Sequence, residues 1–297
     1  MQGVEQFIAP AVSAAPPESR VPTVEVVVIS WQGMGDSSRR IAAQVDRMAN
    51  VSLRIIYSNA AETLEEGPGL WQQVSNTKYF GLKFAAALAD CVSDVLLIIQ
   101  ADALFADWTR IIERCQSRFG HRPQLGLWAP RIDYTPWTPE RVDVRIVGDQ
   151  GLTAVAQTDG VVLAFSRAVM DRLRQLDYGC NNLGWGIDWI AICHCYVHGL
   201  EVLREDEQTV IHSPSRGYGW RDAVLQWRDF MRQMDDQEQV MFQVLLRYTA
   251  ESRRGMIGKI LTLLARRRAV RKATRLERSL VQAARSVQVK LPESGRS

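Results

Sequence analysis

Apolar runs of strand length alternate with amphipathic segments along the first third of the chain. Runs rich in β-branched residues occupy 24–30, 53–57 and 94–100, and each has the length of a buried strand. Segments 37–49 and 78–89 follow the first two runs and have the apolar spacing of helices. Strands that alternate with helices form sheets covered on both faces. This order therefore predicts an α/β fold with a mixed, mainly parallel sheet flanked by helices.

Similar patterns continue to about residue 220, and the chain then becomes helical. Residues 160–166 form a clear apolar strand, and weaker strand patterns flank it. The predicted elements of this part are strands at 124–129, 142–146, 160–166 and 201–203, and helices at 168–176 and 188–198. The run 222–248 has the apolar spacing of a long helix, which predicts a C-terminal helical extension packed onto the α/β domain.

Composition divides the chain of 297 residues into three parts. Residues 1–22 contain several prolines and little periodicity, which indicates a poorly ordered leader. Residues 23–220 have the patterns of one α/β domain, and residues 221–297 form the helical extension. A hydrophobic fraction of 46% is enough to fill a sizeable core.

Cysteine usage and hydropathy limit the cellular setting. The five cysteines are an odd number and are scattered along the chain, which indicates a reducing compartment. No apolar run reaches the roughly 18 to 20 residues of a membrane span. We therefore expect a cytoplasmic protein, and peripheral contact with the inner face of the cell membrane stays open.

Positive charge is concentrated near the C-terminus, although the net charge is only +3. Within 253–285, apolar residues are followed by several arginines, which is the pattern of a basic amphipathic helix. Such a helix can bind an anionic membrane surface, where each basic residue contributes about 1 kcal/mol, and it can equally bind a partner protein. Nucleic acid is disfavoured because no exposed aromatic residues alternate with this charge.

An aspartate follows directly on the third predicted strand. Residues 100–103 read Gln-Ala-Asp-Ala, at the position where open α/β sheets present ligand-binding groups. A carboxylate there, Asp102, can hold a divalent cation that bridges the phosphates of a nucleotide. The alternative is that Asp102 caps a helix that begins near Phe105 or Asp107.

The segment GWGIDW at 184–189 combines one carboxylate with two glycines and two tryptophans. Glycine lets a ligand approach the backbone, indole faces stack on sugar rings, and a fixed aspartate can accept a hydroxyl proton. These properties predict an acceptor site formed by Trp185, Gly186, Asp188 and Trp189. The alternative is a tight turn that is capped by Asp188 and flanked by buried tryptophans.

In order and spacing, these motifs resemble those of GT-A glycosyltransferases, most closely the bacterial family 2 type. The resemblance covers roughly residues 24–219 and rests on VVVISW at 26–31, DVLLIIQAD at 94–102, GWGID at 184–188 and the late His212. It implies a GT-A (Rossmann-like) fold, a nucleotide-sugar donor and a divalent metal, Mn²⁺ or Mg²⁺. By the same resemblance, Asp102 matches the final carboxylate of the Asp-x-Asp metal motif, Asp188 the acceptor-side base, and His212 a further ligand of the metal or the diphosphate.

The chain departs from the family at two donor positions. Gln100 stands at the first position of the metal motif and carries no charge. The acidic residue that usually follows the second strand is replaced by Ser58 or Asn59, so the resemblance does not identify the nucleobase. The donor-binding residues implied are Ser30, Ser58, Asn59, Gln100, Asp102 and Arg216, the last in a loop over the diphosphate.

The resemblance implies transfer of a sugar, with inversion, from a nucleotide-sugar to a hydroxyl of a saccharide or lipid-linked acceptor, in the assembly of bacterial surface polysaccharides. Two other functions stay open. One is an inactive scaffold that binds sugar nucleotides, which the uncharged Gln100 favours. The other is a Rossmann-type, NAD(P)-dependent oxidoreductase. Gly33 and Gly35 favour it, but Ser38 replaces the third glycine of the dinucleotide fingerprint.

Overall fold

The strands and helices of the computed structural model follow the predicted alternation. The model describes residues 21–61, 63–133, 135–148, 151–212 and 218–251. The strands in this part are β1 (Val24–Ile29), β2 (Val51–Tyr57), β3 (Leu70–Gln73), β4 (Val95–Gln100), β5 (Leu125–Ile132), β6 (Asp143–Ile146), β7 (Leu152–Val155), β8 (Val162–Ser166) and β9 (Glu201–Val210). The helices are α2 (Gly35–Val45), α3 (Phe80–Asp90), α4 (Trp108–His121), α5 (Pro139–Val142), α6 (Arg167–Leu173), the 3-10 helix η1 (Tyr178–Cys180), α7 (Ile187–Val197), α8 (Trp220–Met231) and α9 (Asp236–Glu251).

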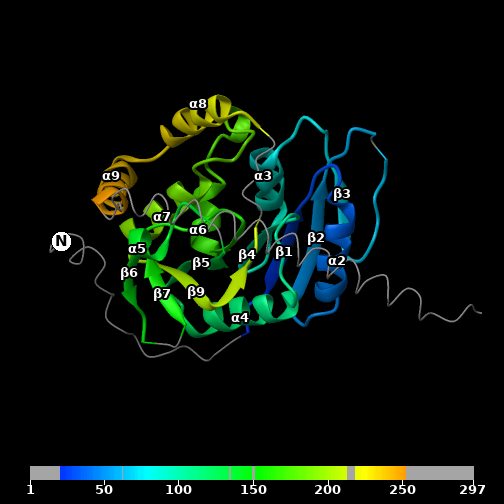
Figure 1. The fold of residues 1–297 in the computed structure, drawn as a ribbon, viewed down its shortest axis with the longest axis horizontal. Coiled ribbons are helices and arrows are strands. Elements are labelled where there is room, and N and C mark those ends of the chain that lie inside the picture. The colour runs from blue at the N-terminus through cyan, green and yellow to red at the C-terminus, as the bar shows by residue number, and fades with distance from the viewer. Residues whose placement is uncertain (1–20, 62, 134, 149–150, 213–217, 252–297) are drawn as a thin grey trace, which may run out of the picture.

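The described strands form one mixed sheet with helices on both faces (Figure 1). The strand order is β3-β2-β1-β4-β8-β5-β9-β7-β6. β3, β2, β1 and β4 are parallel, β8 is antiparallel to both β4 and β5, and β9 is parallel to β5. The predicted α/β fold with a mixed sheet flanked by helices is confirmed.

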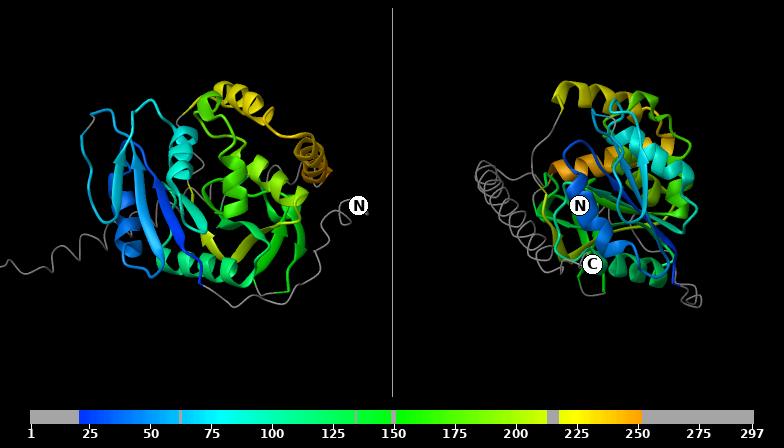
Figure 2. Two further views of the ribbon diagram at one scale, coloured as in Figure 1. Left: turned by 180° about the vertical axis from the view of Figure 1, so that it is seen from behind. Right: turned by 90° about the vertical axis from the view of Figure 1, so that its right-hand side faces the viewer.

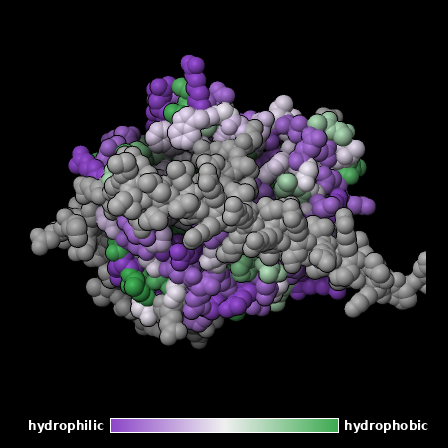
Figure 3. All heavy atoms as spheres, in the orientation of Figure 1, coloured by the Kyte–Doolittle hydropathy of each residue, from purple (hydrophilic) through white to green (hydrophobic). Residues whose placement is uncertain are grey.

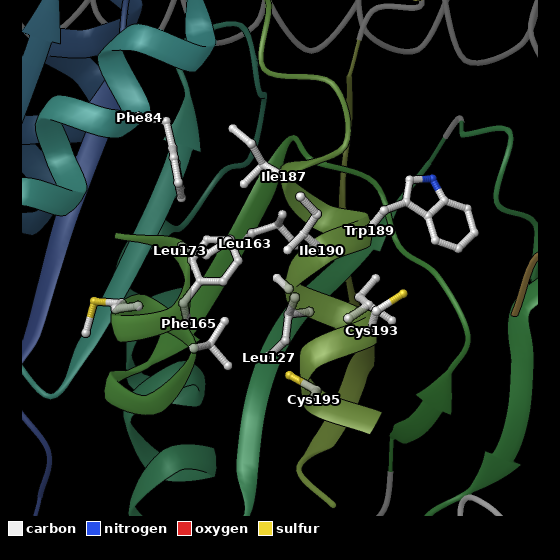
Figure 4. Packing of buried hydrophobic residues seen from close by; sticks show 14 of the residues in the cluster. Phe84, Leu127, Leu163, Phe165, Leu173, Ile187, Trp189, Ile190, Cys193 and Cys195 are labelled. Carbon is white, nitrogen blue, oxygen red and sulfur yellow. The ribbon is translucent and has the colours of Figure 1, made fainter. Parts of the chain in front are cut away.

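Two hydrophobic layers enclose the sheet. Every residue of β1 is buried and β4 is buried almost to its end, as expected for parallel strands covered on both faces. α3, α6 and α7 cover one face, where the side chains of Phe84, Phe165 and Ile190 pack in one cluster (Figure 4). α2 and α4 cover the other face through residues such as Ile41 and Trp108.

α9 packs beside α7, and α8 lies near the 3-10 helix η1 at the outer end of the domain (Figure 2). Phe230 of α8 and Phe242 and Leu245 of α9 belong to the same hydrophobic cluster as the buried face of α7. The predicted packing of the C-terminal extension onto the α/β domain is therefore present as far as α9 extends. The basic helix predicted at 253–285 lies outside the described residues.

The structure differs from the predicted elements in two short strands, in α4, which is not among them, in β9, which is longer than the predicted strand 201–203, and near the C-terminus. The sequence does not predict β3 or β7, because LWQQ and LTAV show no regular alternation of apolar and polar positions. The long helix expected at 222–248 is divided into α8 and α9. The backbone N–H of Glu238 donates to Oδ1 of Asp235 at 2.8 Å, and that of Asp235 donates to Oε2 of Glu238 at 3.1 Å. This reciprocal capping begins a new helix at α9.

The visible surface is mainly polar. On the face shown in Figure 3, most of the described residues are hydrophilic, and the hydrophobic ones form small separate patches. None of the helices in the described part of the chain combines the length and the apolar character that crossing a bilayer requires.

The first turn of α3 packs against the loop 181–186, which leads into α7. The backbone N–H of Gly81 donates to the carbonyl oxygen of Asn182 at 2.8 Å, and the Asn182 side chain makes two further hydrogen bonds with the backbone just before α3. A Cβ at Gly81 would lie 1.9 Å from the carbonyl oxygen of Asn181, so only glycine fits there. The contact joins the parallel half of the sheet to the loop that precedes Asp188.

Gly81→Ala should destabilise the protein, because the added methyl group forces α3 away from this loop. Overpacking of this kind costs about 1–3 kcal/mol, and we expect the free energy of unfolding in urea to fall by that amount. Gly148→Ala is the matched control, since a Cβ there meets no atom within 4 Å. Equal unfolding free energies for the two variants would contradict the close contact at Gly81.

Candidate active site

Three chain segments meet at one edge of the sheet because β4 and β8 run in opposite directions. The carboxyl end of β4 pairs with the amino end of β8, with Ile99 opposite Val162. The carboxyl end of β9 lies at the same edge, because β9 is parallel to β5 and β5 is antiparallel to β8. Residues 100–102, 157–161 and 211–212 therefore come together. The sheet also has a topological switch point between β1 and β4, because β2 and β3 are added on one side of β1 and β4 lies on its other side. Open α/β sheets bind ligands at such a point.

Asp102 and His212 lie side by side at this edge. Nε2 of His212 is 3.1 Å from Oδ2 of Asp102, and a bridge between Leu104 and Ile211 holds the two segments together. The side chains are 23% exposed for Asp102 and 17% exposed for His212. Burial lowers the pKa of His212, but the hydrogen bond and charge of Asp102, together with the charge of Asp159, outweigh it and raise the pKa. Oδ1 of Asp102 is buried and has no hydrogen-bond partner among the described residues.

Asp188 lies in the first turn of α7, directly after the loop 181–186. Its Oδ2 accepts a hydrogen bond of 2.8 Å from the amide of Gln157, a residue that is completely buried. Burial of the carboxylate is the main cause that raises the pKa of Asp188 to about 7, and the negative charge of Asp159 contributes. The hydrogen bonds from the Trp189 backbone and from Gln157 favour the charged form. A carboxylate with this pKa can accept a proton at neutral pH.

Asp159 links these two sites, and the sequence analysis did not include it. Its negative charge contributes to the raised pKa of both Asp188 and His212. Its chain neighbours are held at this edge, because Gln157 donates to Asp188 and the carbonyl oxygen of Gly160 accepts from Gln100. The sequence does carry a signal, an Asp-Gly pair in front of a buried strand. The direction of that strand, which brings Asp159 to the edge where Asp102 lies, cannot be read from the local pattern.

Gln100 holds the segment that precedes β8. Its Nε2 donates to the carbonyl oxygen of Gly160 at 3.0 Å, and its backbone N–H donates to the carbonyl oxygen of Val161 at 3.0 Å. The side chain predicted to contact the donor is thus directed at the loop that contains Asp159. An ionised aspartate could not donate this hydrogen bond, which gives a physical reason for glutamine at this position.

Ser30, Ser58 and Asn59 lie at the carboxyl ends of β1 and β2 and are buried. Nζ of Lys83 donates to the carbonyl oxygen of Ser30 at 2.5 Å and to Oγ of Ser58 at 2.8 Å. The side chain of Asn59 closes a turn with Thr63 through hydrogen bonds of 2.9 and 3.1 Å. The sequence analysis missed Lys83, although a single charge within the apolar helix FGLKFAAALA is a signal that could have revealed it.

The residues of the GWGIDW segment have different surroundings. Trp185 is partly exposed, its Nε1 donates to the hydroxyl of Tyr218 at 2.7 Å, and its ring meets that of Trp220 edge-on at 5.0 Å between centroids. Trp189 is 7% exposed and packs edge-on against two aromatic rings of the core. Gly186 has a φ of 95°, and a Cβ there would lie 2.9 Å from a side chain of α8. This glycine therefore permits the turn into α7 and the close packing of α8, while the ring of Trp185 stays partly exposed beside Tyr218 and Trp220.

The side chains of Asp102 and His212 fit a divalent cation that is bound together with phosphate. No group of three or more His, Cys, Asp or Glu side chains within the described ranges is placed to hold a metal ion. Asp102 and His212 supply two ligands, and the unpartnered Oδ1 of Asp102 is the kind of oxygen that such cations bind. Mg²⁺ is commonly held by one or two carboxylates plus substrate phosphates. Arg216, the predicted diphosphate contact, lies outside the described residues.

A separate cavity of about 520 Å³ lies among α6, α7 and the connection between α8 and α9. It is lined by Ala168, Asp171, Arg172, Gln175, His194, His198, Gln233, Met234 and Asp235. None of these residues belongs to the sheet edge described above. We therefore assign the candidate active site to the edge, where the ionisable groups and the strand ends converge.

No protein-family model matches the sequence, and no curated protein matches it. Solved structures do match the fold. A mannosyltransferase from Pyrobaculum calidifontis, in complex with GDP-Man and Mn²⁺, aligns with 96% of this chain and 86% of its own, with a TM-score of 0.53 and 14% identity. GalNAc-T7, with UDP, GalNAc and Mn²⁺, aligns over 75% of this chain with a TM-score of 0.53 and 12% identity, and the chain spans 50% of that protein. These similarities confirm the predicted GT-A type of fold.

Asp188→Asn should remove a pH dependence of stability. The pKa of Asp188 is about 7 in the folded protein, against an ordinary value of 3.8, so the folded state keeps a proton that the unfolded chain has lost. The free energy of unfolding should therefore fall as the pH rises through this window. Asparagine carries no charge, so the variant should lack this decline in thermal unfolding between about pH 4 and pH 8. An undiminished decline in the variant would show that another group is responsible.

Proposed function

We propose that this chain is a glycosyltransferase that moves a sugar from a nucleotide-sugar donor, with inversion, to a hydroxyl of a saccharide or lipid-linked acceptor. One observation carries the proposal. The same sheet edge holds Asp188, with a pKa of about 7, and the pair of Asp102 with His212. The first is suited to accept a proton, and the second to act on the charge of a diphosphate. The GT-A type of fold supports the proposal at the level of fold class.

Asp188 is the proposed general base. Its carboxylate takes the proton of the acceptor hydroxyl as the hydroxyl oxygen bonds to the anomeric carbon of the donor sugar. The bond between that carbon and the phosphate oxygen breaks, and its electron pair leaves with the nucleoside diphosphate. Attack from the face opposite the leaving group inverts the configuration. Gln157 orients the carboxylate through its hydrogen bond to Oδ2.

Asp159 is the proposed tuning residue between the two halves of the site. Its charge contributes to the raised pKa of Asp188, and a carboxylate with a higher pKa is the stronger base once it is deprotonated. The same charge favours the protonated form of His212. A single carboxylate thus acts on both the acceptor side and the donor side.

Asp102 and His212 are the proposed donor-side residues. They would hold Mn²⁺ or Mg²⁺ together with the diphosphate, and the bound cation would neutralise the charge that develops on the leaving group. Only the neutral form of His212 could bind the cation, whereas without a cation the protonated form would itself place positive charge there. Arg216 remains a predicted further contact with the diphosphate on the sequence alone.

Trp185, Tyr218 and Trp220 form the proposed acceptor surface. Trp220 is 62% exposed, and the ring of Trp185 lies directly beside it. Indole rings stack on the C–H faces of sugars, so this surface suits a saccharide. Three further proposals rest on the sequence and on the family resemblance. They are a lipid-linked acceptor, membrane contact through 253–285, and a role in surface polysaccharide assembly in the cytoplasm.

Asp188→Asn should lower kcat/KM for sugar transfer by about 10²- to 10⁴-fold, because the acceptor hydroxyl loses its base. Nucleotide binding should be unchanged. In the wild type, kcat/KM should rise with pH and level off above a pKa of about 7, since only deprotonated Asp188 accepts the proton. The loss of kcat/KM and its pH dependence are measured by the release of nucleoside diphosphate in the presence of a panel of saccharide acceptors.

Asp46→Asn is the matched control, because Asp46 is exposed in the turn after α2 and far along the chain from the site. It should transfer sugar at the wild-type rate. Full activity in Asp188→Asn would exclude Asp188 as the base. Nucleotide binding by the wild type without transfer to any acceptor would favour the inactive sugar-nucleotide-binding protein.

Asp102→Ala should abolish the stabilisation that a nucleoside diphosphate gives in the presence of Mn²⁺. A ligand at 100 times its Kd stabilises the folded state by about 2.7 kcal/mol, which appears as a higher Tm. We expect this rise in the wild type, with a smaller rise in His212→Ala and after addition of a chelator. An undiminished, metal-dependent rise in Asp102→Ala would remove Asp102 from the donor site.

A further inference from the structure

Lys83 places a buried ammonium group beneath the carboxyl ends of β1 and β2. The residue is only 2% exposed, and lysine is almost never buried this deeply without a charged partner. Its hydrogen bonds go to the Ser30 carbonyl oxygen at 2.5 Å and to Oγ of Ser58 at 2.8 Å, which are both neutral groups. No carboxylate in the described part of the chain contacts it, and burial lowers its pKa to about 8.

This contact fixes the direction in which the Ser58 hydroxyl can act. A hydroxyl has one hydrogen to donate and two lone pairs that accept. Because Oγ of Ser58 accepts a hydrogen bond from Lys83, the hydroxyl hydrogen is directed elsewhere, and no residue within the described ranges accepts it. A buried donor without an acceptor is unfavourable, so a ligand atom at this place would satisfy it.

Ser58 lies on the side of the proposed donor site that is remote from the metal ligands. β2, β1 and β4 are consecutive in the sheet, with Ser58 directly after β2 and Asp102 just after β4. Neighbouring strands are about 4.8 Å apart, so these two strand ends are separated by about 10 Å. A nucleotide whose phosphates lie at Asp102 can extend along the edge and bring its nucleoside to Ser58.

We propose that Lys83 is a positioning residue for nucleoside recognition, which holds the Ser58 hydroxyl as a hydrogen-bond donor toward an acceptor atom of the nucleoside. This inference rests on the proposed function. A carboxylate after β2, as in the family that the sequence resembles, can only accept hydrogen bonds when ionised. The Lys83–Ser58 pair reverses that polarity, so the matching nucleoside atom is an oxygen or nitrogen with a lone pair.

Calorimetric titration with nucleoside mono- and diphosphates tests the inference. The proteins are the wild type, Lys83→Met, Ser58→Ala and the double variant, and the probes are the uridine, cytidine, guanosine and adenosine nucleotides. Each single variant should bind the preferred nucleotide about five- to tenfold more weakly, by the same factor for the mono- and the diphosphate. The double variant should be no weaker than either single one, because both changes remove one and the same hydrogen bond.

Lys78→Met is the matched control, since Lys78 is exposed just before α3, and it should bind as the wild type does. Wild-type affinity in Lys83→Met would overturn the inference. Additive losses in the double variant would also overturn it, because Lys83 would then contact the nucleotide independently of Ser58. A loss confined to the diphosphates would overturn the assignment to the nucleoside.

Lys83→Met removes a buried charge and could fail to fold. In that case Ser58→Ala decides, since an unchanged affinity would refute the role of the hydroxyl and a loss of affinity for both mono- and diphosphates would support it. A wild-type protein that binds none of the nucleotides, with or without Mn²⁺, would instead contradict the proposed function. The two failures are thus distinguishable.

Discussion

The antiparallel pairing of β4 with β8 is the interaction on which the candidate site depends. In an all-parallel sheet, the segment that precedes one strand lies at the opposite edge from the segment that follows its neighbour. Because β8 runs against β4, Gln157 and Asp159 reach the edge where Asp102 lies. Gln100 then fixes this arrangement through its hydrogen bond to Gly160. One reversal of strand direction thus joins the proposed donor and acceptor sides.

Two of the ionisable groups with displaced pKa values at this edge, Asp188 and Lys83, are held by neutral partners. Burial raises the pKa of Asp188 and lowers that of Lys83, so each environment opposes the charged form. Gln157 and Ser58 hold the two groups in position without neutralising them. A charge kept unneutralised in this way costs stability, and such costs are typical of functional sites. The two hydrophobic layers on either side of the sheet supply the stability that offsets them.

The C-terminal helices help to hold the loop 181–186, which precedes Asp188. The backbone N–H of Leu183 donates to Oε1 of Gln226 in α8 at 2.9 Å, and Gly186 leaves room for the side chains of α8. Trp220 begins α8 and lies beside Trp185. The loop that leads to the proposed base is therefore held from one side by α3 and from the other by α8. The extension contributes to the site through packing, whatever the residues beyond α9 do.

The sequence by itself determined the α/β class and most of the strands and helices. It also determined that Asp102 follows a buried strand and that Asp188 lies at the start of a helix. These features depend on periodicity and turn chemistry, which act over a few residues. Only the tertiary structure revealed Asp159 and Lys83, because their roles depend on the direction of β8 and on the packing of α3 over two strand ends. It also separated the two tryptophans of GWGIDW, which look alike in sequence. Trp189 is buried in the core and Trp185 is partly exposed, because the side chains packed around them come from distant parts of the chain.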